Sequence, residues 1–153
     1  MHRGALPART FIAAVLPLLV SGCSSVVDIG PAWNTQIHTE ECEELLSTLP
    51  VTIGGELARE TTPQDLPAAA WGDPPIVLRC GVARPAGLTP TSSLTTIDGV
   101  NWFAEPLTNG VRFTSVPDAP TDSPLYVSMS IPSDYAPEGS LLVDIAPSIQ
   151  AIR

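Results

Sequence analysis

The chain has 153 residues, with sixteen acidic and seven basic side chains and a formal net charge of −9. All seven basic residues are arginine, and the lack of lysine excludes P-loop nucleotide binding, Schiff-base chemistry and serine–lysine catalysis, each of which needs that ammonium group. Because nucleic acid is also negatively charged, this acidity argues against nucleic acid as a partner. The length fits one ordinary domain.

An export signal is predicted at the start of the chain. Two arginines precede an apolar run over residues 11–20, and the small residues Ser21 and Gly22 lead into Cys23. A helix of that length would cross only about half of the bilayer hydrocarbon, so a permanent membrane span is not expected. The segment resembles the bacterial lipoprotein signal, which implies removal of residues 1–22 and attachment of lipid, such as palmitate, to Cys23. An ordinary secretory signal or an uncleaved anchor are the alternatives.

The other two cysteines, Cys42 and Cys80, form an even pair in a chain expected outside the cytoplasm. A disulfide is the first interpretation in that oxidising compartment, and two free buried thiols are the alternative. Closing a loop of about 39 residues is expected to stabilise the fold by roughly 4 kcal/mol. The expected location is the outer face of the cytoplasmic membrane, with the lipid as the anchor.

Residues 23–38 are predicted to form a lipidated tether. Within it, residues 26–29 could add a short edge strand, but the segment is expected mainly to space the domain from the membrane. Ordered structure is predicted to begin at Thr39, as the N-cap of a helix that Pro50 ends. The apolar stripe of this helix comprises Cys42, Leu45, Leu46 and Leu49.

A loop from Gly54 to Pro67 and a strand from Ile76 to Val82 are predicted next. Two tight hairpins follow. Asp98-Gly99 and Asn109-Gly110 each separate two apolar segments, and such dipeptides supply the positive φ that these turns require.

The last strand is predicted over residues 125–131, where apolar and polar residues alternate with the period of two typical of a half-buried strand. A closing helix is expected after Pro137, and Pro147 should kink it or split it in two. Residues 39–153 are therefore predicted to form a single α+β domain. We expect an antiparallel meander sheet of about four to five strands, with the N- and C-terminal helices packed on one face as a two-layer sandwich.

No catalytic, metal or cofactor site is predicted. His38 is the only histidine that remains once the signal is removed, and beside the tether it is expected to be solvated surface rather than part of a zinc site or serine triad. A pair of carboxylates that cleaves a glycosidic bond remains as an enzymatic possibility. Sixteen acidic residues make such a pair easy to imagine, so their number is no evidence for it.

A candidate binding surface is formed by Trp71, Asp73, Arg79 and Trp102, since aromatic side chains beside charges are typical of sugar or peptide grooves. The alternative is structural. Both tryptophans would then pack in the core or at an edge, and Arg79 would pair with an acid.

Five segments carry a family resemblance: "CEELLSTLP", "AAWGDPPIVLRCGV", "PTSSLTTIDGVNWFAEPL", "VRFTSV" and "YAPEGSLLVDIAP". In that order they resemble the actinobacterial family of exported proteins and lipoproteins known as domain of unknown function 3515. The resemblance implies a small exported domain with a paired cysteine framework, here Cys42 and Cys80. It supplies no activity and no catalytic residue. Departures lie in the tether and in the loop from Pro117 to Pro124.

The expected function is therefore a non-enzymatic envelope lipoprotein that binds a protein or a wall component. Two alternatives from other classes are kept. One is a carboxylate-dependent hydrolase of cell-wall saccharides, which needs two acids facing each other across a cleft. The other is a carrier of a small apolar ligand, which needs an open cavity between helices and sheet.

Overall fold

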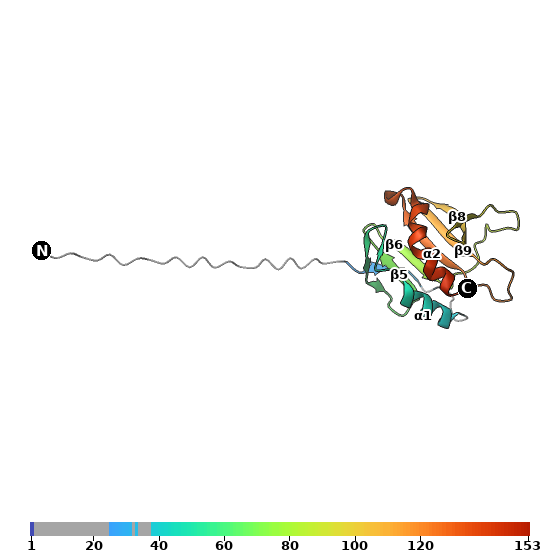
Figure 1. Ribbon diagram of the computed structural model, residues 1–153, viewed down its shortest axis with the longest axis horizontal. Helices are drawn as coiled ribbons and strands as arrows, with labels where there is room; N and C mark the ends of the chain where they lie inside the picture. Colours follow the sequence, from blue (N-terminus) through green and yellow to red (C-terminus); the bar gives the residue numbers. More distant parts are fainter. Residues whose placement is uncertain (2–24, 32, 34–37) are drawn as a thin grey trace.

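A computed structural model describes residue 1, residues 25–31, residue 33 and residues 38–153. Within these residues an antiparallel sheet carries two helices on one face (Figure 1). The mixed α+β class predicted from the sequence is confirmed. In spatial order the strands are β2 (Thr52–Ile53), β3 (Glu56–Arg59), β5 (Ala68–Trp71), β6 (Ile76–Cys80), β10 (Val127–Pro132), β9 (Gly110–Val116), β8 (Val100–Leu107) and β7 (Thr95–Ile97).

The sheet has eight strands, so the expected four to five is wrong. It consists of two meanders, β2-β3-β5-β6 and β7-β8-β9-β10, joined where β6 pairs with β10. The missing strands lie mostly between Gly54 and Trp71, in and just after the segment predicted as a loop. They are only two to four residues long, and three of the four residues in β5 are alanine, which has a low strand propensity.

The two hairpins are confirmed. Ile97 pairs with Val100, so Asp98 and Gly99 form the first turn, and both have positive φ, at 44° and 75°. In the second hairpin Leu107 pairs with Gly110, so the turn consists of residues 108–109 and the glycine begins β9 with a φ of 143°. A Cβ atom at Gly110 would lie 2.1 Å from the backbone oxygen of Ile131, which explains why glycine stands there.

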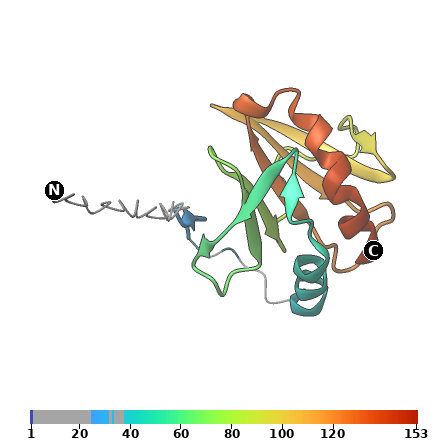
Figure 2. The ribbon, with the colours of Figure 1, turned by 60° about the vertical axis from the view of Figure 1, so that its left-hand side comes forward.

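Helix α1 (Thr39–Thr48) and helix α2 (Leu142–Ala151) pack on the same face of the sheet (Figures 1 and 2). His38, not Thr39, occupies the N-cap position of α1. The second helix follows the 3-10 turns η1 (Ser133–Tyr135) and η2 (Glu138–Leu141) and continues through Pro147, which does not split it. Ser148 of α2 donates a hydrogen bond of 2.8 Å to the carbonyl of Thr48, which ties the two helices together.

The core fills the space between the helices and the sheet. Apolar residues of β6 and β10 meet the apolar stripes of both helices, as the alternation over residues 125–131 predicts. Cys42 and Cys80 form a disulfide that joins α1 to β6. The central members are Leu45, Ile76, Leu78, Met129, Ile131, Leu142, Ile145 and Ile149, each with 1% or less of its surface exposed.

Part of the expected tether packs against the domain. Strand β1 (Val27–Asp28) pairs in parallel with β4 (Thr61–Thr62), and Val27 and Ile29 are buried. Figure 2 shows this blue segment beside the green strands, away from α2. Ordered structure therefore starts well before Thr39, because two apolar side chains in this segment find cover on the second face of the sheet. No helix among the described residues has the length and apolar character needed to span a membrane.

Candidate functional site

The four residues of the predicted binding surface do not form one surface. Trp71 and Trp102 are 1% and 0% exposed and lie in the core between sheet and helices. Asp73 is on the outside, where its side chain is 86% exposed and lies 3.8 Å from the Arg59 guanidinium. Arg79 lies on the opposite face of the sheet, because it alternates along β6 with the buried Leu78 and Cys80. Cys23 lies outside the described residues.

Strand register brings polar side chains together around Arg79. Ser128 of β10 pairs with Arg79 on one side and with Thr114 of β9 on the other. Directly paired residues point to the same face of a sheet, so these three side chains form a row on the face away from the helices. Arg112 lies on that face as well, two residues before Thr114 along β9.

This row is the floor of a pocket of about 620 Å³, which we call the sheet-face pocket. Its walls come from two segments far apart in sequence, residues 28–31 with Trp33 on one side and residues 82–83 and 85–86 on the other. Ligand pockets in proteins are commonly about 300–1,000 Å³, so its size is suitable for a small molecule or for part of a larger one. Asp28 and Glu105 contribute carboxylates to its lining.

Arg79 fixes the first wall. Its Nη2 donates a hydrogen bond of 2.7 Å to the carbonyl of Ile29, and its guanidinium carbon lies 5.4 Å from the centre of the Trp33 ring. The indole Nε1 of Trp33 donates in turn to the carbonyl of Cys80, at 2.7 Å. A cation over an aromatic face is attracted by the ring quadrupole, so these contacts hold Ile29 and Trp33 against the sheet.

The floor of the sheet-face pocket is electrostatically unusual. Burial, and then the nearby positive charge of Arg112, lower the pKa of Arg79, although a guanidinium remains protonated. Within the part of the chain that the structure describes, neither arginine has a carboxylate oxygen within 4.0 Å. The alternative that Arg79 simply pairs with an acid is therefore wrong for the described residues.

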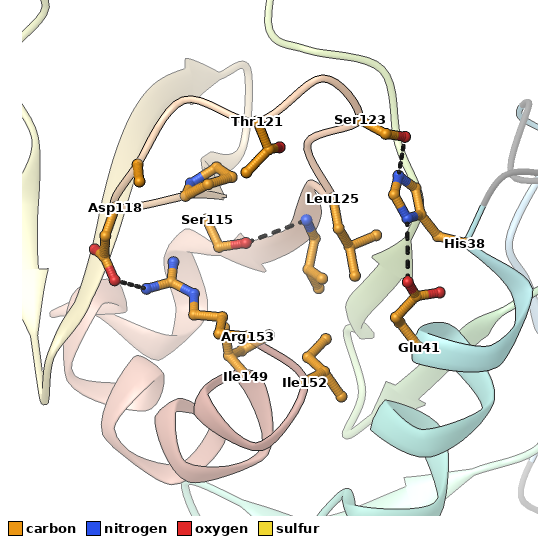
Figure 3. A pocket seen from close by; sticks show the side chains of 13 residues that line it. His38, Glu41, Ser115, Asp118, Thr121, Ser123, Leu125, Ile149, Ile152 and Arg153 are labelled. Carbon is orange, nitrogen blue, oxygen red and sulfur yellow. Dashed lines mark hydrogen bonds and ion pairs between the residues drawn. The ribbon is translucent and has the colours of Figure 1, made fainter.

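A second pocket, of about 330 Å³, lies between the end of α2 and residues 117–125 (Figure 3). We call it the helix-side pocket. Its inner lining is apolar and includes Leu125, Val127 and Ile149. Its rim carries the ion pair between Arg153 and Asp118, at 3.2 Å.

His38 lies at this rim rather than in free solvent, since its side chain is only 14% exposed. Its Nε2 is 3.4 Å from the Ser123 hydroxyl, and its Nδ1 is 3.7 Å from the Glu41 carboxylate (Figure 3). The order serine, histidine, acid is that of a nucleophilic triad. However, 3.7 Å is too long for a hydrogen bond, and Ser123 is exposed on a loop, so this geometry does not activate the serine.

The described residues contain no group of three or more histidine, cysteine, aspartate or glutamate side chains that could hold a metal ion. Sequence reasoning missed Trp33, Arg112, Thr114 and Ser128. Alternation in β9 indicates that Arg112 and Thr114 share a face, but only the pairing of β9 with β10, and of β10 with β6, brings them to Arg79.

The chain belongs to the family described as Protein of unknown function (DUF3515), whose model matches residues 8–152. The family resemblance of the five sequence segments is thereby confirmed. A search of curated proteins gave no match, and neither did a search of solved structures.

Proposed function

We propose that this protein is an exported lipoprotein, anchored by Cys23 at the outer face of the cytoplasmic membrane, that binds an envelope component in the sheet-face pocket without catalysing a reaction. The lipoprotein-type signal supports the anchor. The binding role rests on one observation, the pocket of about 620 Å³ whose floor carries two arginines without carboxylate partners among the described residues. A concave site with a few convergent charged and hydroxyl groups that have no partner in the fold is typical of ligand binding.

The anchor is tested by metabolic labelling with a fatty acid. Wild type should carry label and fractionate with membranes, whereas Cys23→Ala should lose both. Cys42→Ala with Cys80→Ala is the control, since these cysteines form the disulfide and should leave labelling unchanged. Label that persists in Cys23→Ala would refute the assignment of the acylation site.

The binding role is tested by affinity capture of the anchored protein from its own membranes, followed by mass spectrometry. Arg79→Gln should reduce recovery of the specific component. Arg84→Gln is the matched control, because Arg84 is exposed and lies outside the pocket lining, so it removes the same charge from elsewhere on the surface. Equal capture by both variants would contradict the proposed site.

A second candidate function is carriage of a small apolar ligand. The helix-side pocket supports it, since the pocket lies between α2 and the sheet and its inner lining is apolar. Its volume of about 330 Å³ is at the lower end of ligand pockets. A fluorescent fatty-acid probe should bind wild type, and Ile152→Trp, which would fill the pocket from a partly exposed lining position, should abolish that binding. Probe binding that survives this substitution would exclude the helix-side pocket as the carrier site.

A further inference from the structure

The arginines of this chain differ in how their charge is balanced. Arg59 lies 3.8 Å from the Asp73 carboxylate, and Arg153 lies 3.2 Å from the Asp118 carboxylate. Both are at the periphery of the domain. Arg79 and Arg112, which share the floor of the sheet-face pocket, have no such partner among the described residues.

The hydrogen-bonding capacity of the pocket floor is largely unused. The guanidinium of Arg112 makes no hydrogen bond or ion pair with any described residue, and of the guanidinium nitrogens of Arg79 only Nη2 donates, to Ile29. The side-chain hydroxyls of Thr114 and Ser128 form no hydrogen bond within the described part of the chain, and both residues line the pocket. Since Nε1 of Trp102 is the one buried side-chain polar atom without a partner among the described residues, these hydroxyls are open to the pocket, and the four side chains are available to a ligand.

The two carboxylates that line the pocket do not act as counter-ions for Arg79 and Arg112. Asp28 uses its Oδ1 to accept a hydrogen bond of 2.8 Å from the backbone N–H of Gly30. Glu105 is the cross-strand partner of Arg112, yet their charged atoms are more than 4.0 Å apart. The burial that lowers the pKa of Arg79 also makes its charge costly without a counter-ion. An anion supplied from outside would offset that cost.

We propose that the floor of the sheet-face pocket is an oxyanion subsite, in which Arg79, Arg112, Thr114 and Ser128 hold a carboxylate or phosphate group of the ligand. This inference rests on the proposed binding function and names the chemistry of its ligand. Guanidinium forks match both kinds of oxyanion, and the two hydroxyls lie beside the arginines on the same face of the sheet, where they can donate to the remaining oxygens. The Trp33 wall then contacts the adjoining organic part.

The test uses the full chain purified in detergent, titrated with inorganic phosphate and separately with acetate at constant ionic strength. Isothermal titration calorimetry should show saturable binding of at least one of these ions, and the stronger one identifies the group. Arg112→Gln should weaken that binding about tenfold or more, as should Thr114→Val with Ser128→Ala. Arg84→Gln should bind as wild type does. Because the guanidinium of Arg112 makes no hydrogen bond or ion pair among the described residues, its substitution should leave the melting temperature unchanged, so a folding defect does not confuse the result.

Wild type that binds neither ion, or an Arg112→Gln variant that binds as tightly as wild type, would overturn the subsite. A second variant, Ala86→Trp, distinguishes failure of the oxyanion subsite from failure of the proposed binding function. It fills the sheet-face pocket from the second wall. If capture of the envelope component is lost in Ala86→Trp but not in Arg112→Gln, the pocket binds its ligand without an oxyanion subsite. If capture survives in Ala86→Trp, both proposals are wrong.

Discussion

The guanidinium carbon of Arg79 lies 5.4 Å from the centre of the Trp33 ring, and this contact joins the segment before α1 to the middle of the sheet. It makes an apparent spacer into a wall of the sheet-face pocket. The same arginine therefore holds the wall and faces the ligand space.

The first prediction concerns that wall. Trp33→Ala should lower the free energy of unfolding by about 1–2 kcal/mol more than Trp33→Phe, because the phenylalanine keeps an aromatic face for the guanidinium while both variants lose the hydrogen bond to Cys80. Urea denaturation of the two variants measures the difference. Equal stability would show that the ring contact does not hold the wall.

The second prediction concerns the disulfide. Cys42 and Cys80 are 38 residues apart, so replacing both by alanine should lower the free energy of unfolding by about 4 kcal/mol through the greater freedom of the unfolded chain. The midpoint of urea denaturation reports this loss. Dithiothreitol should shift the wild-type midpoint in the same direction and leave the double variant unaffected. A wild-type midpoint that stays fixed after thiol assays show full reduction would contradict this role.

The third prediction compares the two buried tryptophans. The Nε1 of Trp71 donates to the carbonyl of Pro50 at 3.0 Å, whereas the Nε1 of Trp102 is buried without a hydrogen-bond partner among the described residues. Trp71→Phe should therefore destabilise the protein by about 1 kcal/mol more than Trp102→Phe, which removes a donor that has no partner. Thermal and urea unfolding of this matched pair provide the measurement. A larger loss in Trp102→Phe would mean that its N–H has a partner after all.

The fourth prediction is a pH dependence. Tyr135 donates a hydrogen bond of 2.8 Å to the carbonyl of Pro74, and burial, followed by the charge of Glu56, raises its pKa above the ordinary value of 10.0. Below pH 10 the phenol is neutral in the folded and the unfolded state, and its contribution to the free energy of unfolding is fully present. Above it the unfolded chain ionises first, so stability is lost as the pH rises through the folded-state pKa.

Tyr135→Phe tests this sign. The variant should be about 1 kcal/mol less stable than wild type at pH 8, because it lacks the hydrogen bond to Pro74, and the gap should narrow as the pH rises beyond 10. Free energies of unfolding at several pH values measure it. A gap that widens with pH would show that the folded state stabilises the phenolate instead.

Much of the sheet could be predicted from local sequence signals. Asp98-Gly99 and Gly110 mark their hairpins because few other residues adopt positive φ at low cost, and the alternation of residues 125–131 identifies the face that meets the core. The short strands β2, β3 and β5 were harder to predict, although Gly54 and Gly55, both with positive φ, form the turn between β2 and β3. These strands are only two to four residues long, and a run of alanines in β5 has a low strand propensity, so the flanking segments show no alternating apolar pattern.

The candidate site was harder to predict, because its residues come from strands that are separated in the sequence. The sequence predicts a surface in which Arg79 lies with Trp71, Asp73 and Trp102, and the structure does not bring these four residues together. Side chains on a strand alternate between faces, so Trp71 lies in the core. The true neighbours, Arg112 and Ser128, come from β9 and β10 and reach Arg79 only through register. Trp33 lies beside Arg79 because the segment before it is held on the sheet by the buried side chains of Val27 and Ile29.

The contact between Arg59 and Ser25 has a consequence for how the protein would sit on a membrane. The guanidinium donates to the backbone carbonyl and, at 2.6 Å, to the hydroxyl of Ser25, which fastens that residue to β3. Cys23 is two positions earlier, a distance that extended chain covers in at most about 7 Å. A lipid on Cys23 would thus hold the domain close to the lipid head groups. Its binding partners would then be molecules near the membrane surface.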